Sequence, residues 1–355
     1  MSATMERPGT AGGPVTEQDV QAYLRQGLKN RWWPVLPSRF VETGGKPTGI
    51  VRHNEPLVVW RDQTGTVRVQ ADRCPHRAVP LSRGLNEGDR LRCNYHGVEI
   101  GVDGTVLAVP GQPGCALEGK KAVKTYPSQE VAGAIFVWFG DALHLDAPPF
   151  VPPPQLTAPE YSSFLCYADW EMFWRYLYDN NMDPMHGTFL HANSHTMYQG
   201  DLEAHFVTRD TSTGFFFEKA GQRNVNFDWS ELVDDGALYV RLEIPYPPAA
   251  GPGGNFGIIS FGCPIDEDNV ACFFWRVRKV EGWERDTWRF LYKTRIEARH
   301  WHVLEQDREM LQGCKPGMER YETLYAHDAG VIRLRRLLGQ TAKAQITELR
   351  AAGKA

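Results

Sequence analysis

Three potential metal ligands lie close together near the middle of the chain: Asp183, His186 and His191. Carboxylate and imidazole groups are ligands that iron and zinc both accept. Asp183 and His186 are three residues apart and share one face of a helix, whereas His186 and His191 point about 140° apart on an ideal helix. A wide π-like turn, or an unwinding at Gly187, would bring both imidazoles to one ion. The spacing therefore predicts a metal site at a helix bend, with two unrelated histidines after a helix end as the alternative.

A second set of potential ligands lies nearer the N-terminus, in the pairs Cys74-x-His76 and Cys93-x-x-His96. Thiolate and imidazole together serve both structural zinc and iron–sulfur clusters. Zinc fingers usually place two cysteines on one turn and two histidines on the other, whereas each of these turns supplies one of each. This mixed arrangement favours a two-iron cluster in which each turn contacts both metals. A structural zinc site is the competing interpretation.

These two pairs resemble the Rieske motif. By this resemblance, Cys74 and Cys93 bind one iron of a [2Fe-2S] cluster, and His76 and His96 bind the other. The nearby segment 109–113 is similar to the proline-containing loop that covers such clusters.

The segment 295–312 is predicted to be a helix that carries a carboxylate on its inner face. By helical spacing that face consists of Ile296, His300, Val303, Asp307 and Met310. Burying an ionised aspartate without a partner costs several kcal/mol, so Asp307 needs a cation. A metal shared with His186 and His191 would complete the two-histidine, one-carboxylate triad that holds Fe(II) and leaves positions open for dioxygen. The alternative is a salt bridge to a nearby arginine, namely Arg295, Arg299 or Arg308.

Over most of residues 30–307 the two sites together resemble the α (terminal oxygenase) subunit of a Rieske non-haem iron oxygenase of the aromatic-ring-hydroxylating type. The resemblance implies an NADH- and O2-dependent enzyme whose cluster passes electrons to a mononuclear iron. The chain has no Gly-x-Gly-x-x-Gly fingerprint, so we expect a separate reductase, acting directly or through a ferredoxin, to oxidise NADH. The abundance of Phe, Trp and Tyr in the second half favours an apolar, aromatic substrate. An O- or N-demethylating monooxygenase is the nearest alternative, and a Rieske electron carrier or zinc-binding module without oxygenase activity is the alternative from another class.

The family resemblance gives Asp183 a role other than iron ligation. In the family, an aspartate three residues before the first iron-binding histidine joins that histidine to a cluster histidine of a neighbouring subunit. Here it would connect His186 to His96 of the partner subunit and carry electrons between chains. The resemblance therefore implies a homotrimer or a multiple of trimers. The residues that we expect to contact substrate are Asn180, Phe173, Leu177 and Tyr178.

The order of the expected elements predicts an α+β protein in two domains after a disordered leader, residues 1–15. Residues 16–145 are expected to form an all-β Rieske domain with an N-terminal helix. Residues 146–355 are expected to form the catalytic domain, an antiparallel sheet with flanking helices. The proline-rich segment 146–154 cannot continue a strand or helix and marks the boundary. The Pro/Gly-rich loop 245–254 is interpreted as a lid, an entrance or variable surface.

The secondary structure is predicted from turn residues and from hydrophobic periodicity. A capping box at Thr16 begins a helix that reaches about Leu28, and Asp169 is expected to be the N-cap of a second helix. Hairpin turns are expected at 62–65 and 102–105. Strands are predicted over 57–60, 66–69, 134–139, 161–167, 202–207, 214–218, 237–244, 256–261, 270–277 and 287–291.

The composition is that of an ordinary globular protein of 355 residues with 42% hydrophobic content. A net charge of −4 without a basic block gives no case for nucleic-acid binding. No stretch reaches the ~18 apolar residues of a membrane span, and we expect a cytoplasmic protein. Seven cysteines, an odd number, do not suggest a disulfide framework. Those without a partner at ligand spacing are Cys115, Cys166, Cys263, Cys272 and Cys314.

Overall fold

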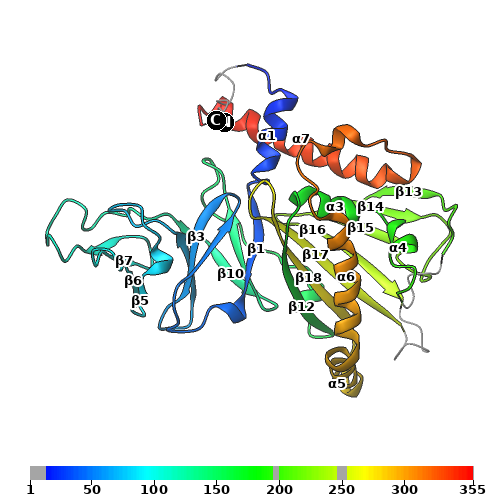
Figure 1. Ribbon diagram of the computed structural model, residues 1–355, viewed down its shortest axis with the longest axis horizontal. Helices are drawn as coiled ribbons and strands as arrows, with labels where there is room; N and C mark the ends of the chain where they lie inside the picture. The colour runs from blue at the N-terminus through cyan, green and yellow to red at the C-terminus, as the bar shows by residue number, and fades with distance from the viewer. Residues whose placement is uncertain (1–12, 195–199, 246–253, 355) are drawn as a thin grey trace.

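The computed structural model describes residues 13–194, 200–245 and 254–354, in which a smaller all-β part adjoins a larger part made of one sheet and several helices (Figure 1). The α+β fold class predicted from the sequence is confirmed. Most of the leader 1–15 and of the loop 245–254 lies outside the described residues. Within the described residues, no helix is both long and apolar enough to span a membrane.

The all-β part contains three small antiparallel sheets. The first is formed by β2 (Thr48–Arg52), β3 (Glu55–Arg61), β4 (Val67–Ala71) and β9 (Thr125–Tyr126). The second is formed by β5 (Leu85–Asn86), β6 (Arg90–Arg92), β7 (Glu99–Gly101) and β8 (Val106–Ala108). The third is formed by β1 (Arg31–Pro37), β11 (Ala134–Phe139) and β10 (Ser128–Val131). The predicted strand 134–139 coincides with β11, because its unbroken apolar run is buried throughout.

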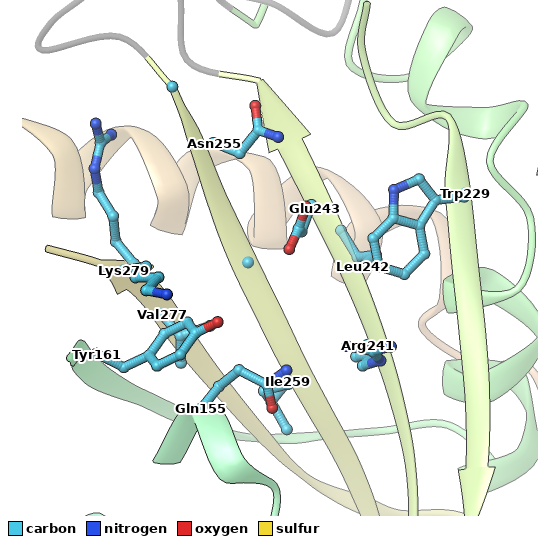
Figure 2. Close-up of a pocket in the computed structure, with 13 residues that line it drawn as sticks. Gln155, Tyr161, Trp229, Arg241, Leu242, Glu243, Asn255, Ile259, Val277 and Lys279 are labelled. Atoms are coloured by element: carbon cyan, nitrogen blue, oxygen red, sulfur yellow. The ribbon is translucent and has the colours of Figure 1, made fainter. Parts of the chain in front are cut away.

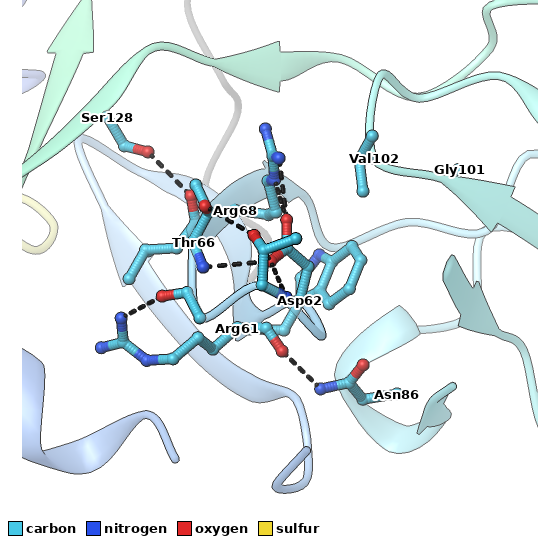
Figure 3. A network of polar contacts seen from close by, with 12 residues as sticks. Arg61, Asp62, Thr66, Arg68, Asn86, Gly101, Val102 and Ser128 are labelled. Atoms are coloured by element: carbon cyan, nitrogen blue, oxygen red, sulfur yellow. Dashed lines mark hydrogen bonds and ion pairs between the residues drawn. The ribbon is translucent and has the colours of Figure 1, made fainter. Parts of the chain in front are cut away.

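The predicted turn at 62–65 joins β3 to β4 and is organised by one carboxylate (Figure 3). Asp62 Oδ1 accepts hydrogen bonds from the backbone N–H groups of Thr64 and Thr66 at 2.9 and 3.0 Å. Arg68 donates to Asp62 Oδ2 at 2.8 Å. These bonds fix the hairpin that carries the chain toward Cys74.

A seven-stranded antiparallel sheet forms the centre of the larger part, in the order β12–β18–β17–β16–β15–β14–β13. Its strands are β12 (Tyr161–Trp170), β13 (Phe206–Asp210), β14 (Gly214–Lys219), β15 (Trp229–Asp234), β16 (Leu238–Pro245), β17 (Asn255–Pro264) and β18 (Val270–Lys279). The prediction missed β15 and placed the strand at 202–207 too early. The expected helix N-cap at Asp169 is also wrong, since β12 continues to Trp170 and pairs with β18 along its whole length.

The helices of the larger part pack mainly on one face of this sheet (Figure 1). They are α3 (Trp174–Asn181), α4 (His186–Phe189), α5 (Gly282–Leu291) and α6 (Glu297–Leu311), with a π-helical turn at 292–296 between the last two. The prediction of a strand at 287–291 is wrong, because this segment belongs to α5. Its buried residues, Trp288 and then Tyr292 and Ile296, recur every four positions, which is a helical spacing that a five-residue window is too short to reveal.

The third small sheet packs against the opposite face of the large sheet. Phe136 of β11 stacks on Trp275 of β18 with ring centroids 6.0 Å apart and meets Phe261 of β17 edge-on at 5.5 Å. The Trp275 indole also donates to the Ala132 carbonyl at 2.9 Å. One hydrophobic core is therefore continuous between the two parts of the chain.

The two ends of the described chain lie together (Figure 1). Helix α1 (Glu17–Arg25) begins with the predicted capping box at Thr16 and packs on α7 (Ala329–Ala351). Arg350 of α7 forms a 3.0 Å ion pair with Asp19 of α1. The helix ends at Arg25, earlier than predicted, because Gly27 takes a left-handed conformation with φ of 84°.

Candidate metal centre and cluster-binding loops

The short helix α4, the turn that follows it and the long helix α6 bring three of the predicted ligands together. His186 begins α4, and His191 lies in the turn that follows it, while Asp307 is on α6. The predicted distortion at Gly187 is wrong: α4 is regular through Gly187, and the chain leaves the helix after Phe189. Ending the helix there lets the second imidazole turn back toward the first.

The three side chains form a compact cluster with one ligand atom each. Asp307 Oδ1 lies 3.5 Å from His186 Nε2 and 3.2 Å from His191 Nε2, and the three atoms all lie within 4.8 Å of one another. Asp307 Oδ1 is buried and accepts no hydrogen bond from the described residues. The alternative of a salt bridge to arginine is not realised among these residues, since Arg308 pairs with Glu305 instead. An orphaned buried carboxylate oxygen facing two imidazoles is an environment that a divalent cation fits.

Hydrogen bonds to the outer nitrogen of each ring fix how the two histidines are presented. His186 Nδ1 donates to the backbone carbonyl of Asp183 at 2.5 Å, and His191 Nδ1 donates to Gln306 Oε1 at 3.0 Å. Both rings therefore direct the Nε2 atom toward Asp307. Sequence reasoning missed Gln306, although its position next to Asp307 on the same helix was the available signal.

The negative charge of Asp307 raises the pKa of His191, the nearer of the two histidines. Burial lowers the pKa of His191, but the contact with the negatively charged Asp307, 3.2 Å from Nε2, raises it by more, so that the pKa lies above the usual value. The carboxylate thus favours a positive charge at this position.

The inner face of α6 differs from the prediction at its C-terminal end. Ile296, His300 and Asp307 are buried as expected, together with Leu304. Met310 was predicted to be buried, but it is 66% exposed, and Leu311 packs against the core in its place. The 3.6-residue period explains the correction, because the buried face moves from Asp307 to Leu311 in one turn.

The second set of ligands lies on two loops that have the same pattern of backbone hydrogen bonds. Cys74 and Cys93 each exchange backbone hydrogen bonds with residues four and five positions later. The bonds are Ala78 N to Cys74 O at 2.8 Å, Cys74 N to Val79 O at 2.8 Å, Gly97 N to Cys93 O at 2.9 Å, and Cys93 N to Val98 O at 2.9 Å. The two loops thus share the same backbone hydrogen bonds, while the histidine is the second residue after the cysteine in one loop and the third in the other.

The side chains of these loops converge. Both cysteines are buried, and burial together with the neighbouring Cys93 raises the pKa of Cys74 to about 11. The rings of His76 and His96 lie with their centroids 4.6 Å apart, and both histidines are exposed. A pair of buried thiols beside a pair of exposed imidazoles fits a [2Fe-2S] cluster bound by two cysteines on one iron and two histidines on the other.

The proline-containing segment 109–113 lies beside these loops. Gly97 has φ of 73°, and a side chain there would bring its Cβ within 3.4 Å of Pro110 Cγ. The left-handed φ favours glycine at this position, and the contact distance shows that Pro110 packs directly against the loop.

Asp183 and the residues expected to contact substrate occupy different environments. Asp183 keeps a partly exposed carboxylate, whose Oδ1 accepts from the Met185 N–H at 2.9 Å. Asn180 is half-buried at the end of α3. Phe173, Leu177 and Tyr178 are buried, and the Tyr178 hydroxyl bonds the Leu238 carbonyl and the Gly262 N–H.

Two pockets lie near this part of the fold. One, of about 390 Å³, opens on the side of the sheet away from α6 (Figure 2). Its lining includes Tyr161, Trp229, Arg241, Glu243, Ile259 and Lys279. Most of the strand residues of this lining alternate with those that face the helices, and no residue of the triad is among the residues that line it. The other, of about 510 Å³, lies between Asn193–Ser194 and α6 and is nearer the triad, since Ser194 bonds Gln306 at 3.4 Å.

A β domain with two Cys–His loops, joined to a helix-covered sheet with a His–His–Asp cluster, defines a protein with two metal centres. Comparison with protein families identifies both parts: a Rieske [2Fe-2S] domain at residues 31–127 and a vanillate O-demethylase oxygenase C-terminal domain at residues 170–344. The chain therefore contains a Rieske domain followed by an oxygenase C-terminal domain, the two-part arrangement that the resemblance to Rieske oxygenases implied.

Individual relatives agree with this family. The chain is 28% identical to the oxygenase subunit of phthalate 4,5-dioxygenase from Pseudomonas putida, over 76% of this chain and 64% of the relative. It is 36% identical to the vanillate O-demethylase oxygenase subunit of Pseudomonas sp. strain HR199, over 47% of this chain and 46% of the relative. The matched regions thus span less than two thirds of these relatives' lengths.

A solved structure shares the fold. It is the reduced complex between oxygenase and ferredoxin in carbazole 1,9a-dioxygenase, with a TM-score of 0.73 at 20% identity, covering 92% of this chain and 94% of that one.

Proposed function

We propose that this chain is the terminal oxygenase component of a Rieske oxygenase system that uses NADH and O2 to hydroxylate an apolar, aromatic substrate. In this proposal His186, His191 and Asp307 hold Fe(II), and Cys74, Cys93, His76 and His96 hold the [2Fe-2S] cluster. The observation that carries it is the orphaned Asp307 Oδ1 facing two imidazole Nε2 atoms in a chain that also contains a Rieske domain. When bound, the two metal groups supply one-electron transfer and oxygen activation.

The protein's own contribution at the mononuclear site is orientation. The Asp183 carbonyl and the Gln306 amide oxygen each hold one imidazole N–H, so that both Nε2 atoms face the position of the ion. The three ligands occupy one side of that position, which leaves the other side for dioxygen and substrate. The apolar residues of α6 and of the sheet beneath it exclude water from that side.

We propose that Asp183 connects this site to the cluster of another subunit, in a homotrimer or a multiple of trimers. The surface around Asp183 supports this role, because it is apolar yet exposed: Phe189 is 64% and Tyr325 62% exposed. Burial and the nearby carboxylates of Asp328 and Asp183 raise the pKa of Tyr325, which places its ring near Asp183. The exposed imidazoles of the cluster loops are the complementary surface on the neighbouring copy.

We propose that electrons arrive from a separate NADH-oxidising reductase, directly or through a ferredoxin. The solved relative, an oxygenase in complex with ferredoxin, supports this arrangement. The seven free cysteines fit a reducing compartment, and a cytoplasmic location is proposed on that basis.

We also propose that the boundary between the Rieske domain and the catalytic domain lies within the proline-rich segment 146–154.

Oxidative O- or N-demethylation is the second candidate. The family model that matches residues 170–344 is named for vanillate O-demethylase, and the relative of that name has the higher identity of the two described above. Isotopically labelled dioxygen separates the two reactions, since demethylation releases formaldehyde whereas ring hydroxylation retains the label in the ring product.

An iron and acid-labile sulfide assay on anaerobically purified protein tests the proposal. Iron should exceed sulfide, because the cluster contains them in equal amounts and the second site adds iron alone. His186→Ala should remove only the excess iron. If the wild-type protein contains zinc and no sulfide, the zinc-module alternative is correct instead. If its iron content equals its sulfide content, the electron-carrier alternative is correct instead.

A further inference from the structure

One row of side chains crosses the large sheet on the face that the helices cover. Residues directly opposite each other on paired strands point to the same face. From β12 to β14, the strand register gives the row Phe164, Arg276, Ile258, Leu242, Ser230 and Phe217. The row is apolar except at two positions, Arg276 and Ser230.

Helix α6, which carries Asp307, and helix α3, which precedes α4 in the chain, lie over this row. Asn181, at the end of α3, donates to Ser260 Oγ at 2.9 Å, and His300 of α6 stacks on Phe256 with ring centroids 4.6 Å apart. Ser260 and Phe256 are the residues of β17 on either side of Ile258 that point the same way. The centre of the row therefore lies between the end of α3 and the first turn of α6.

Arg276 is a buried cation without a counterion in the part of the chain that the structure describes. Its side chain is 2% exposed, and its Nε and Nη1 atoms have no hydrogen-bond partner there. Its described interactions are with the Phe274 ring, at 5.8 Å from the centroid, the outer limit of a cation–π interaction, and with the Tyr292 phenol, which is uncharged because burial raises its pKa. Arg31, which is buried to a similar degree, instead binds Asp234 through two hydrogen bonds.

Burying a guanidinium group without a partner is strongly unfavourable, so such a group is retained where a ligand supplies the missing charge. Guanidinium presents a planar fork of N–H donors that matches a carboxylate with two parallel hydrogen bonds. Ile258 and Leu242, next in the row, offer an apolar surface of about the width of two strand spacings, or roughly 10 Å, on which a ring can lie. At the far side, Ser230 Oγ is also buried without a described partner.

We propose that Arg276 binds the carboxylate of the substrate, and hence that the substrate is an aromatic carboxylic acid whose ring lies over Ile258 and Leu242. Ser230 then receives a polar substituent at the other end of the ring. This assignment rests on the proposed oxygenase function, because it places the ligand beneath α6, the helix that carries Asp307. It narrows the substrate class from apolar aromatic compounds to their acids.

Calorimetric titration of the anaerobic holoprotein with benzoate and with benzamide tests the assignment. The two probes have nearly the same shape, but only benzoate is charged at neutral pH. Wild-type protein should bind benzoate tighter than benzamide by roughly tenfold or more, and Arg276→Gln should abolish this preference while leaving benzamide affinity unchanged. Arg276→Lys should restore part of the preference, since it restores the charge but not the planar fork.

Arg241→Gln is the matched control, because Arg241 lies on the opposite face of the same sheet and pairs with Glu231. It should leave both affinities unchanged. Equal affinity of the wild type for the two probes, or no benzoate binding, would overturn the assignment even if Arg276→Gln failed to fold. The titration needs no turnover, so its outcome is independent of the iron and sulfide assay. If the wild type contains more iron than sulfide but binds benzoate no tighter than benzamide, only this inference is contradicted. If its iron equals its sulfide, the oxygenase function itself is contradicted.

Discussion

Asp307 Oδ1 lies 3.2 Å from His191 Nε2, although the two residues are more than a hundred positions apart in the chain. The oxygen has no hydrogen-bond donor among the described residues, and the imidazole is turned toward it by Gln306. The negative charge of the Asp307 carboxylate is therefore buried in the protein interior, where it faces only the imidazoles of His191 and His186 among the described residues.

Replacing Asp307 by Asn should remove the mononuclear iron and leave the cluster intact. The amide keeps the size of the side chain but not its charge, so the two imidazoles alone would hold the ion weakly. We expect turnover to fall by about 100-fold or more, comparable to or beyond the loss from a disturbed outer shell. Iron and sulfide should become equal, while the visible spectrum of the cluster stays unchanged. Retention of excess iron would argue against Asp307 as a ligand.

Gln306→Leu should weaken iron binding without removing any ligand. Loss of the amide oxygen frees the Nδ1–H of His191, and outer-shell changes of this kind typically cost ~10–100-fold in metal affinity. Competition with a chelator measures the effect. Ser194→Ala is the control: its hydroxyl reaches Gln306 only at 3.4 Å, so its removal should change the affinity little.

Asp183→Asn should retain both metal centres but lose most turnover. The backbone carbonyl that orients His186 is unaffected by this change, so iron should remain bound. The lost function would be electron transfer between chains, which rapid-mixing measurements of cluster reoxidation can follow directly. Normal turnover in the variant would show that the carboxylate is not on the electron path.

Asp62→Asn should destabilise the all-β part at neutral pH and hardly at all in acid. Burial raises the pKa of Asp62, but hydrogen bonds from Thr64, Arg68 and Thr66 outweigh it and hold the pKa at about 2, below the usual 3.8 (Figure 3). A depressed pKa stabilises the fold above pH 3.8 and loses that stabilisation as the pH falls toward 2. The expected cost at neutral pH is about 2 kcal/mol in the free energy of unfolding.

Denaturant titrations between neutral and acid pH measure this difference. Asp89→Asn is the matched control, since Asp89 pairs with Arg90 on an exposed hairpin and should contribute little at any pH. A pH-independent penalty for Asp62→Asn would mean that shape rather than charge holds the turn.

The two kinds of ligand differed in how far the sequence could locate them. Cys74, His76, Cys93 and His96 lie on two short loops whose geometry is local, so spacing was enough to group them. Asp307 was inferred from a carboxylate on an apolar helical stripe, and the structure brings it to the histidines. Gln306 gave no pattern, because a polar residue beside a buried position is ordinary on any helix.

The errors have a common cause in tertiary packing. Asp169 is a good helix N-cap by residue type, but pairing with β18 keeps it in an extended strand. The segment 287–291 is compatible with a strand by alternation, yet burial of Trp288 against the sheet makes it helical. Met310 lies on the wrong side of α6 because the helix follows its own 3.6-residue period.

The sequence by itself determined the two ligand sets, the α+β class and the family, because these depend on residue types at short spacings and on periodicity. Only the tertiary structure decided that Asp307 Oδ1 has no partner except two imidazoles, and that Arg276 is buried without a counterion beneath the same helices. Both facts concern what surrounds a charge rather than what precedes or follows it in the chain. The energy of a buried charge is set by neighbours from distant strands and helices, which local sequence does not specify.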